Sequence, residues 1–158
     1  MVKDFREYLV ESSRHETFGR VFKELGFGDN FFISFQASDT HGSEPCETLD
    51  DVYAYTRWEV SLRANKPAID VPNAGAWDFL KNNYWAKPFD KPEFQRAMVA
   101  DCVPVKHCQQ ILQDATEMAV IKGYIKSEDE IRIVEADEEI KRTKVVGGGC
   151  GGCGGGKK

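Results

Sequence analysis

The residues best suited to chemistry by type and spacing are Cys150 and Cys153, which are separated by two glycines. Two cysteines at this spacing can close a disulfide, share a soft metal ion, or carry and resolve a persulfide. Each of these reactions needs a thiolate, and only Lys157 and Lys158 supply positive charge nearby. We therefore expect the reactivity of this pair to be conferred by a partner site.

The segment that carries the pair, residues 145–158, is called the C-terminal tail below. It contains eight glycines and no apolar side chain after Val146. Such a composition cannot offset the entropy that a chain loses on ordering, so we expect a flexible tail. Both sulfurs should sample positions about 10–15 Å from Val146 and reach about 25 Å when the chain is extended. The sequence thus predicts a thiol arm that visits a site on its own body or on a docked partner.

The run Gly148-Gly149-Cys150-Gly151-Gly152 resembles the terminal Gly-Gly-Cys-Gly-Gly arm of the sulfur-carrier subunit in thiosulfate-oxidising systems, and it repeats in overlapping form around Cys153. In that family the cysteine is a swinging attachment point for sulfur intermediates. The resemblance implies a sulfur-carrying role for Cys150 and Cys153 and assigns a role to no other residue.

Other interpretations of the tail remain open at this point. A Gly/Cys tract can be an inert low-complexity extension or an added handle for labelling. The chain can also be the precursor of a modified peptide, with residues 145–148 as the leader boundary and Cys150 and Cys153 cyclised to azoles.

A second group with chemical potential is Cys102, His107 and Cys108, around Pro104. Pro104 suits the first turn of a helix, where free amides and the helix dipole would lower the pKa of Cys108. The three side chains offer soft metal ligands to which the tail could add a fourth sulfur, although the spacing is not a recognised zinc pattern. Plain burial of both cysteines is the competing interpretation, and the one we favour.

A polar loop and an aromatic segment complete the candidates. His41 and Cys46 lie in a loop after a short strand and could bind metal or act as base and nucleophile, although turn formation is the interpretation of the loop that we favour. Trp85 precedes the pair Lys87-Pro88, and Phe89 lies between that pair and Lys91-Pro92, which makes both aromatic residues candidates for anchoring a partner protein. The alternative, which we favour, is that they are core residues.

Composition narrows the class of protein. The chain has 158 residues, 41% of them hydrophobic, and a net charge of −5, which suits one globular domain over residues 1–144 followed by the tail. The acidic balance argues against nucleic acid as a partner. Because no stretch approaches about 18 apolar residues and no export signal is visible, we expect a cytoplasmic protein that does not bind membranes, with five cysteines kept reduced or bound to metal.

Hydrophobic periodicity predicts a mainly α fold of about five helices with a minor two-stranded sheet. One helix or two short ones are expected over 3–25, with Gly26 as cap. Further helices are expected over 49–64, 74–83, 91–100 and 105–122, where Gly123 ends the last one. Alternation predicts a strand over 31–35. The segment 130–135 is ambiguous, and we favour a strand that pairs with 31–35 over a helix that begins at Ser127.

No phosphate loop, dinucleotide fingerprint, nucleophile elbow or recognised zinc signature is present. We therefore expect a small non-catalytic carrier or accessory subunit, which uses Cys150 and Cys153 to bring sulfur, electrons or a soft metal to a larger enzyme or protein complex. Its cofactor would be zinc, copper, an iron–sulfur centre or bound sulfane sulfur. A modified-peptide precursor, or an assembly subunit with an inert tail, is the alternative.

Overall fold

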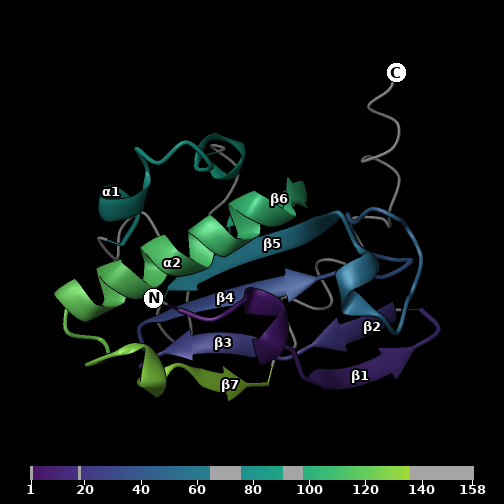
Figure 1. Cartoon of the computed structure of the whole chain (residues 1–158), viewed down its shortest axis with the longest axis horizontal. Coiled ribbons are helices and arrows are strands. Elements are labelled where there is room, and N and C mark those ends of the chain that lie inside the picture. Colours follow the sequence, from purple (N-terminus) through teal and green to yellow (C-terminus); the bar gives the residue numbers. More distant parts are fainter. Residues whose placement is uncertain (1, 18, 65–75, 91–97, 136–158) are drawn as a thin grey trace.

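A computed structural model describes residues 2–17, 19–64, 76–90 and 98–135. Its main feature is a five-stranded antiparallel sheet with one long helix across one face (Figure 1). The strands lie in the order β6-β5-β4-β3-β7, and a separate two-stranded sheet pairs β1 with β2. The strands are β1 Glu11–His15, β2 Gly19–Phe22, β3 Glu24–Phe27, β4 Phe31–Gln36, β5 Arg57–Ala64, β6 Met98–Pro104 and β7 Arg132–Val134.

Two α-helices and four short 3₁₀ helices accompany the sheets in the described ranges. The long helix α2, Val105–Ile121, starts directly after β6, and Gly123 follows it with φ +80°, a conformation that favours glycine. The short helix α1 spans Ala76–Leu80. The 3₁₀ helices are η1 Phe5–Tyr8, η2 Val52–Ala54, η3 Lys87–Phe89 and η4 Glu128–Glu130.

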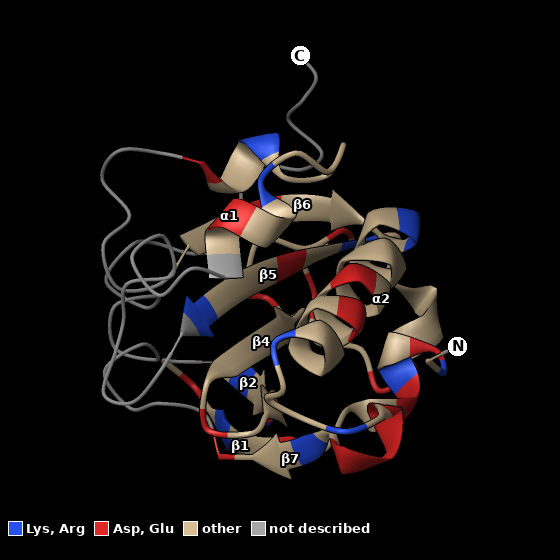
Figure 2. Ribbon diagram, turned by 90° about the vertical axis from the view of Figure 1, so that its left-hand side faces the viewer, with Lys and Arg blue, Asp and Glu red and all other residues tan. Residues whose placement is uncertain are grey.

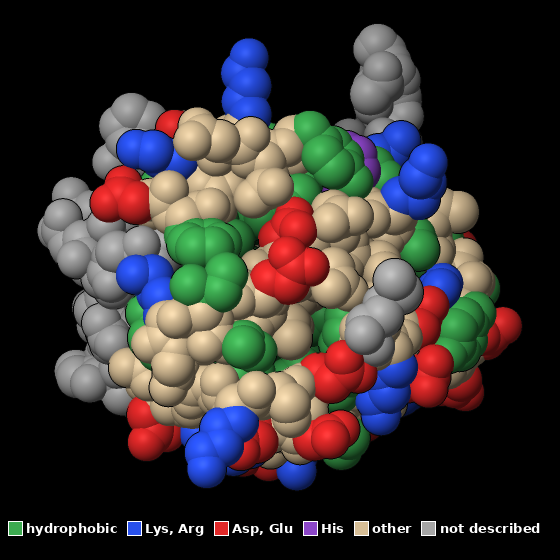
Figure 3. Space-filling model, turned by 60° about the vertical axis from the view of Figure 1, so that its left-hand side comes forward, with side chains coloured by type: hydrophobic (Ala, Val, Ile, Leu, Met, Phe, Trp, Pro, Cys, Tyr) green, Lys and Arg blue, Asp and Glu red, His purple; other side chains and the backbone are tan. Residues whose placement is uncertain are grey.

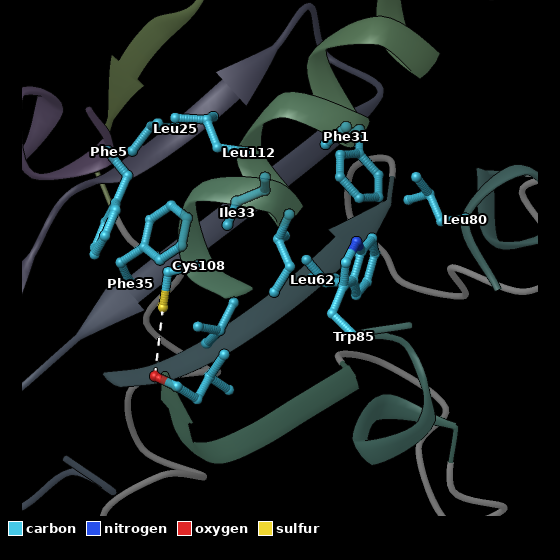
Figure 4. Close-up of a cluster of buried hydrophobic side chains, with 14 of the residues drawn as sticks. Phe5, Leu25, Phe31, Ile33, Phe35, Leu62, Leu80, Trp85, Cys108 and Leu112 are labelled. Atoms are coloured by element: carbon cyan, nitrogen blue, oxygen red, sulfur yellow. Dashed lines mark hydrogen bonds between the residues drawn. The ribbon is translucent and has the colours of Figure 1, made fainter. Parts of the chain in front are cut away.

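The hydrophobic core lies between α2 and one face of the sheet, as Figure 4 shows. Alternate residues of the central strands point into it, and α2 contributes a stripe at three- and four-residue spacing. The helix residues that pack there are Cys108, Ile111, Leu112, Ala115, Met118 and Ala119. At one end of this core, Phe5 of η1 packs on Phe35 and Trp58, with ring centroids 4.6 and 5.3 Å apart.

The opposite face of the sheet is also buried but carries polar side chains. There the Arg63 guanidinium pairs with the Glu24 carboxylate and lies over the ring of Phe32. Because strands β3, β4 and β5 are covered on both faces, nearly every one of their described residues is buried. Continuous burial of this kind removes the simple alternation by which a half-exposed strand is recognised.

The expectation of a mainly α protein was therefore wrong. The predicted helix over 3–25 is η1 followed by β1, β2 and the start of β3, and Gly26 lies within β3 instead of capping a helix. The predicted helix over 49–64 is η2 followed by β5. The last three positions of the helix predicted over 91–100 belong to strand β6, and residues 91–97 lie outside the described residues.

Several local predictions were confirmed. The strand over 31–35 is β4, and the long helix after Pro104 is α2. The short helix over 74–83 is present as α1, which buries Trp77 and Leu80. The ambiguous segment divides between the two options, because Ser127 caps η4 and Arg132–Val134 then forms β7. This strand pairs with β3, however, and not with β4 as expected.

Candidate functional site

The candidate site begins at a bulge in β6, the strand at one edge of the sheet. The register of β6 against β5 shifts between Trp58 and Val60, so that both Asp101 and Cys102 lie opposite Glu59. Such an extra residue bends the strand and re-aims side chains. Met98, Ala100 and Val103 point into the core, whereas Asp101 is exposed and Cys102 is half-buried. The bulge thus moves Cys102 out of the core position that strict alternation would have given it.

Cys102 also has an unusual backbone conformation, with φ +59°. An L-residue other than glycine costs roughly 1–2 kcal/mol in this left-handed region. Among the described non-glycine residues it is the only one with a positive φ. Strain of this kind persists only where surrounding contacts hold the residue in place.

The loop between β4 and β5 lies directly against the bulge. The Cys102 amide donates a hydrogen bond to the Gly42 carbonyl at 2.9 Å, and the Gly42 amide donates to Glu59 Oε1 at 2.9 Å. A Cβ atom on Gly42 would stand 2.6 Å from the Cβ of Asp101, so only glycine fits here without a shift. The loop therefore fastens to both strands of the bulge.

A second set of bonds ties the next part of this loop to the same place. The Glu44 amide donates to the Arg57 carbonyl at 3.1 Å, and the Arg57 side chain reaches the Glu44 carboxylate at 3.3 Å. The same guanidinium donates through Nη1 to the Cys102 carbonyl at 3.2 Å. Cys46 follows two residues after Glu44 and is exposed. Cys46 and Cys102 thus belong to two segments that are bonded to one another, although 56 positions separate them in the sequence.

Both cysteines are disulfide-bonded. This finding differs from the expectation that the cysteines are reduced or metal-bound. We call Cys46, Cys102 and the loop and bulge that hold them the edge thiol site. Its chemistry is that of sulfur: disulfide exchange in the oxidised form, and thiolate or metal-thiolate chemistry once the bonds are reduced.

His41 is placed on the inner side of this loop, away from solvent. Its Nδ1 lies 2.6 Å from Ser38 Oγ, and both side chains are buried. Ser43 adds a bond from its hydroxyl to the Ser38 carbonyl at 3.2 Å. These contacts brace the loop, and they leave His41 in a different environment from exposed Cys46, with which it was considered as a base–nucleophile or metal pair.

Cys108 is buried at 0% exposure, as the packing interpretation predicted, while the same interpretation was wrong for Cys102. The Cys108 thiol donates to the Val103 carbonyl at 3.6 Å, the dashed line in Figure 4. Burial raises the pKa of Cys108 far above the usual range of a thiol. The expectation that the helix N-terminus lowers this pKa was wrong, because removal from water outweighs the dipole.

The structure does not assemble Cys102, His107 and Cys108 into a metal site. Cys108 is free and enclosed by the core, and the His107 ring packs edge-on against Tyr84 with centroids 4.8 Å apart. In the described ranges, no group of three or more His, Cys, Asp or Glu side chains is arranged to hold a metal. The tail lies outside these ranges, so Cys150 and Cys153 are not part of that finding.

Trp85 and Phe89, the candidate partner anchors, are core residues at 1% exposure each. Their rings pack edge to face at 5.8 Å, and the indole nitrogen of Trp85 donates to Asp114 Oδ2 on α2 at 2.8 Å. Neither ring is available to a partner in this conformation. Their role is to fasten the segment after α1 to the long helix.

Sequence reasoning missed the pairing of the Cys46 loop with the Cys102 bulge. The available signals were Gly42 in the loop and an apolar alternation in β6 that breaks at Cys102, but the contact joins distant parts of the chain. No protein-family model, curated protein or solved structure matches this chain. Among the described residues, no helix is long and apolar enough to cross a membrane.

Proposed function

We propose that this protein is a small non-catalytic carrier or accessory subunit whose C-terminal tail delivers sulfur, electrons or a soft metal to a larger partner enzyme. One observation carries the proposal: Cys46 and Cys102, the described cysteines outside the core, both take part in disulfides. They share one edge of the sheet, where loop and bulge are joined by hydrogen bonds. The chain thus combines a structured thiol surface with a Cys-Gly-Gly-Cys pair that the sequence places on a glycine-rich arm.

The mechanism uses the two tail cysteines in turn. The thiolate of Cys150 takes up the cargo, for example the terminal sulfur of a donor persulfide, as a new persulfide. The thiolate of Cys153 then attacks the inner sulfur of that persulfide. This attack releases hydrosulfide and leaves a Cys150–Cys153 disulfide, which a thiol reductant returns to two thiols. Delivery as sulfane sulfur follows when an acceptor thiolate attacks the outer sulfur instead.

The body supports a carrier more than an enzyme. The contact between the Ser38 hydroxyl and the His41 imidazole resembles part of a nucleophile–base pair, but both groups are buried, so a substrate cannot reach them. A surface groove of about 500 Å³ lies beside the C-terminal half of α2. No cysteine or histidine is among the residues that line it. These are Gln113, Thr116, Glu117, Val120, Ile121, Ser127 and Glu128.

This groove favours a second candidate function, that of an assembly subunit. Its apolar residues are exposed, Ile121 at 68% and Val120 at 40%, and they stand between the carboxylates of Glu117 and Glu128. On the face shown in Figure 3, hydrophobic and acidic side chains likewise lie next to each other, and Figure 2 shows the acidic residues along α2. A partner segment with apolar and basic residues would suit such a surface.

The experiment that tests the carrier function is intact mass measurement of protein purified from its native host, without reductant and after reduction. Fragmentation of the last 14 residues locates any change. Added sulfur, bound metal or a disulfide at Cys150 or Cys153 supports the carrier. Water losses or truncation there would instead indicate a modified-peptide precursor.

A second measurement separates carrier from assembly subunit. In cells that express Cys153→Ser, a persulfide on Cys150 should accumulate, because the thiolate that resolves it is missing. Cys150→Ser/Cys153→Ser serves as the negative control. If partner capture survives deletion of residues 147–158 but is lost in Ile121→Glu, the assembly role holds and the carrier role is rejected.

A further inference from the structure

We propose that the groove beside the C-terminal half of α2 is the docking site for one amphipathic helix of a partner protein, which places apolar side chains on Ile121 and basic side chains towards Glu117 and Glu128. The inference rests on the proposed function, because a carrier or an assembly subunit has to dock on its partner. It adds the place of docking and the kind of segment that docks there.

The wall of the groove that α2 forms has a shape that suits a second helix. Its lining residues recur at three- and four-residue steps over about two helical turns, roughly 12 Å, and are Gln113, Thr116, Glu117, Val120 and Ile121. An extended segment would need unpaired amides and carbonyls, but backbone groups within a helix are bonded to one another. A docking helix needs none of them, because it packs its side chains between those of α2.

The other wall of the groove comes from Ser127 and Glu128, in the chain that turns back after α2 (Figure 1). This segment is fastened before it reaches the groove. The Tyr124 amide donates to the Ala119 carbonyl at 2.8 Å, and Ile125 is buried in the core. Both walls are thus in place before a partner arrives, which lowers the entropic cost of docking.

The apolar part of the groove is open to solvent. Ile121 is 68% exposed and Val120 is 40% exposed. The Thr116 hydroxyl donates to the Leu112 carbonyl at 2.7 Å, inside the helix, so its donor needs no acceptor from the groove. The volume of about 500 Å³ lies within the range of about 300–1,000 Å³ typical of binding pockets. Large apolar side chains of a partner can therefore cover both exposed residues.

Charge indicates which partner fits this apolar surface. The described residues that line the groove include two carboxylates and neither lysine nor arginine. Glu117 Oε2 accepts a hydrogen bond from the Gln113 side-chain amide at 3.1 Å, and Glu117 makes no ion pair with another described residue. A lysine or arginine beside the apolar face of a docking helix would complement this charge.

The negative charge continues beyond the groove. The pKa of Tyr8 is raised by burial and then by three nearby carboxylates, those of Glu128, Asp129 and Glu7. Lys3 Nζ, 4.5 Å from the centroid of the Tyr8 ring, offsets only part of this charge. A second copy of the chain would bring the same carboxylates to the groove, and like charges oppose such a contact. The charge therefore favours a basic segment of another protein over self-association.

The experiment selects binders to the full-length protein from a displayed library of random peptides of about 16 residues, long enough for four helical turns. We expect the enriched peptides to carry apolar residues at three- and four-residue steps together with an excess of lysine and arginine. Fluorescence anisotropy of the most enriched peptide then gives Kd for the parent protein and its variants.

Variants of the groove separate its apolar and acidic parts. Ile121→Glu should weaken peptide binding by about 30-fold or more, as expected for a buried apolar anchor, and Ile121→Ala by about 5-fold. Glu117→Gln should weaken it by about 2–5-fold at low salt and by less at high salt. Unchanged thermal unfolding of these variants would show that lost binding does not come from misfolding.

Two matched controls lie away from the groove. Tyr84→Glu changes a residue that is 63% exposed and packs on His107, near the N-terminal end of α2. Glu16→Gln removes an exposed carboxylate between β1 and β2. Both should bind the peptide as the parent does.

The outcomes also separate the docking site from the proposed function. Enriched peptides that are acidic, or that bind Ile121→Glu as tightly as the parent, would overturn the docking site, as would the absence of any enriched peptide. In each case the intact-mass measurement still decides whether the chain is a carrier. If the peptides bind the groove as expected while Cys150 and Cys153 carry no modification in protein from the native host, the docking site stands and the assembly subunit is favoured over the carrier.

Discussion

Cys102 and Cys108 are six positions apart, yet they occupy opposite environments. Cys108 points from the first turns of α2 into the core, where burial keeps its thiol protonated and inert. Cys102 stands on the bulge of β6, half-exposed, in a left-handed backbone conformation and in a disulfide. The difference shows that the direction in which the backbone presents a cysteine, more than the residues beside it in sequence, decides whether its sulfur reacts.

The sharpest test of this contrast is alkylation of the reduced, folded protein by iodoacetamide in the presence of a chelator. We expect Cys46 and Cys102 to be labelled readily, and Cys108 to react slower by a factor of 10³ or more, on the order set by the free energy needed to open the core. Because burial raises the pKa of Cys108, its thiol stays protonated in the closed core, and labelling proceeds only through opening. Peptide mass mapping over time provides the rates, and equal labelling of Cys108 and Cys46 would contradict the contrast.

A smaller effect should come from Gly42→Ala, which acts on the edge alone. The new Cβ would meet Asp101 at 2.6 Å, so loop or bulge must shift, at a cost of about 1–3 kcal/mol in the free energy of unfolding. Urea unfolding measures the stability, and the labelling rate of Cys102 should change in the folded state.

The control for that variant is Gly123→Ala after α2. Gly123 has φ +80° but no neighbour within 4 Å of an added Cβ, so only the backbone strain of about 1–2 kcal/mol is expected. The labelling rate of Cys102 should stay as in the parent. Equal effects of the two variants on that rate would show that Gly42 does not hold the edge thiol site.

Glycine and alanine variants should differ in stability in opposite directions at Cys102 and at Cys108. In the reduced protein, Cys102→Gly should be more stable than Cys102→Ala by about 1–2 kcal/mol, since glycine accepts the positive φ. Within α2, Cys108→Ala should be more stable than Cys108→Gly by about 1 kcal/mol, because glycine weakens a helix. Chemical denaturation of the four variants measures these stabilities. The same order at both positions would contradict the backbone strain inferred for Cys102.

The smallest expected change in stability comes from Asp4, the N-cap residue of η1. Asp4 accepts bonds from the Arg6 amide and guanidinium, and the guanidinium bond lowers the pKa of Asp4. A lowered pKa contributes stability above the unfolded value of about 4, which is lost as pH falls through the folded value. Asp4→Asn should therefore cost about 0.5 kcal/mol at pH 7 and less near pH 3. Urea unfolding at both pH values tests it, and a pH-independent cost would assign the effect to the neutral hydrogen bond.

Prediction from sequence succeeded where structure is local. Helix α2 was readable because its inward residues follow a helical period over 17 residues between Pro104 and Gly123. Strand β4 was readable from the alternation of Phe31, Ile33 and Phe35. Helix α2 shows one buried stripe, whereas β4 alternates only in residue type, because all six of its residues are buried.

Prediction from sequence failed for β2, β3 and β5, whose described residues are buried almost throughout. On the far side of the sheet, Glu59, Ser61 and Arg63 are polar yet covered, so their types gave no sign of burial. Without a half-exposed face, helical and strand periods could not be told apart, and the count of helices came out too high.

For this protein the sequence by itself determined the long helix α2, the middle strand β4 of the five-stranded sheet, and a glycine-rich segment that carries two cysteines. Tertiary structure alone decided that Cys46 and Cys102 share one edge of the sheet while Cys108 is sealed inside. The reason is physical: helix periods and caps arise from neighbours within a few residues, whereas the bulge at Cys102 and the close approach of Gly42 depend on strand register between distant segments.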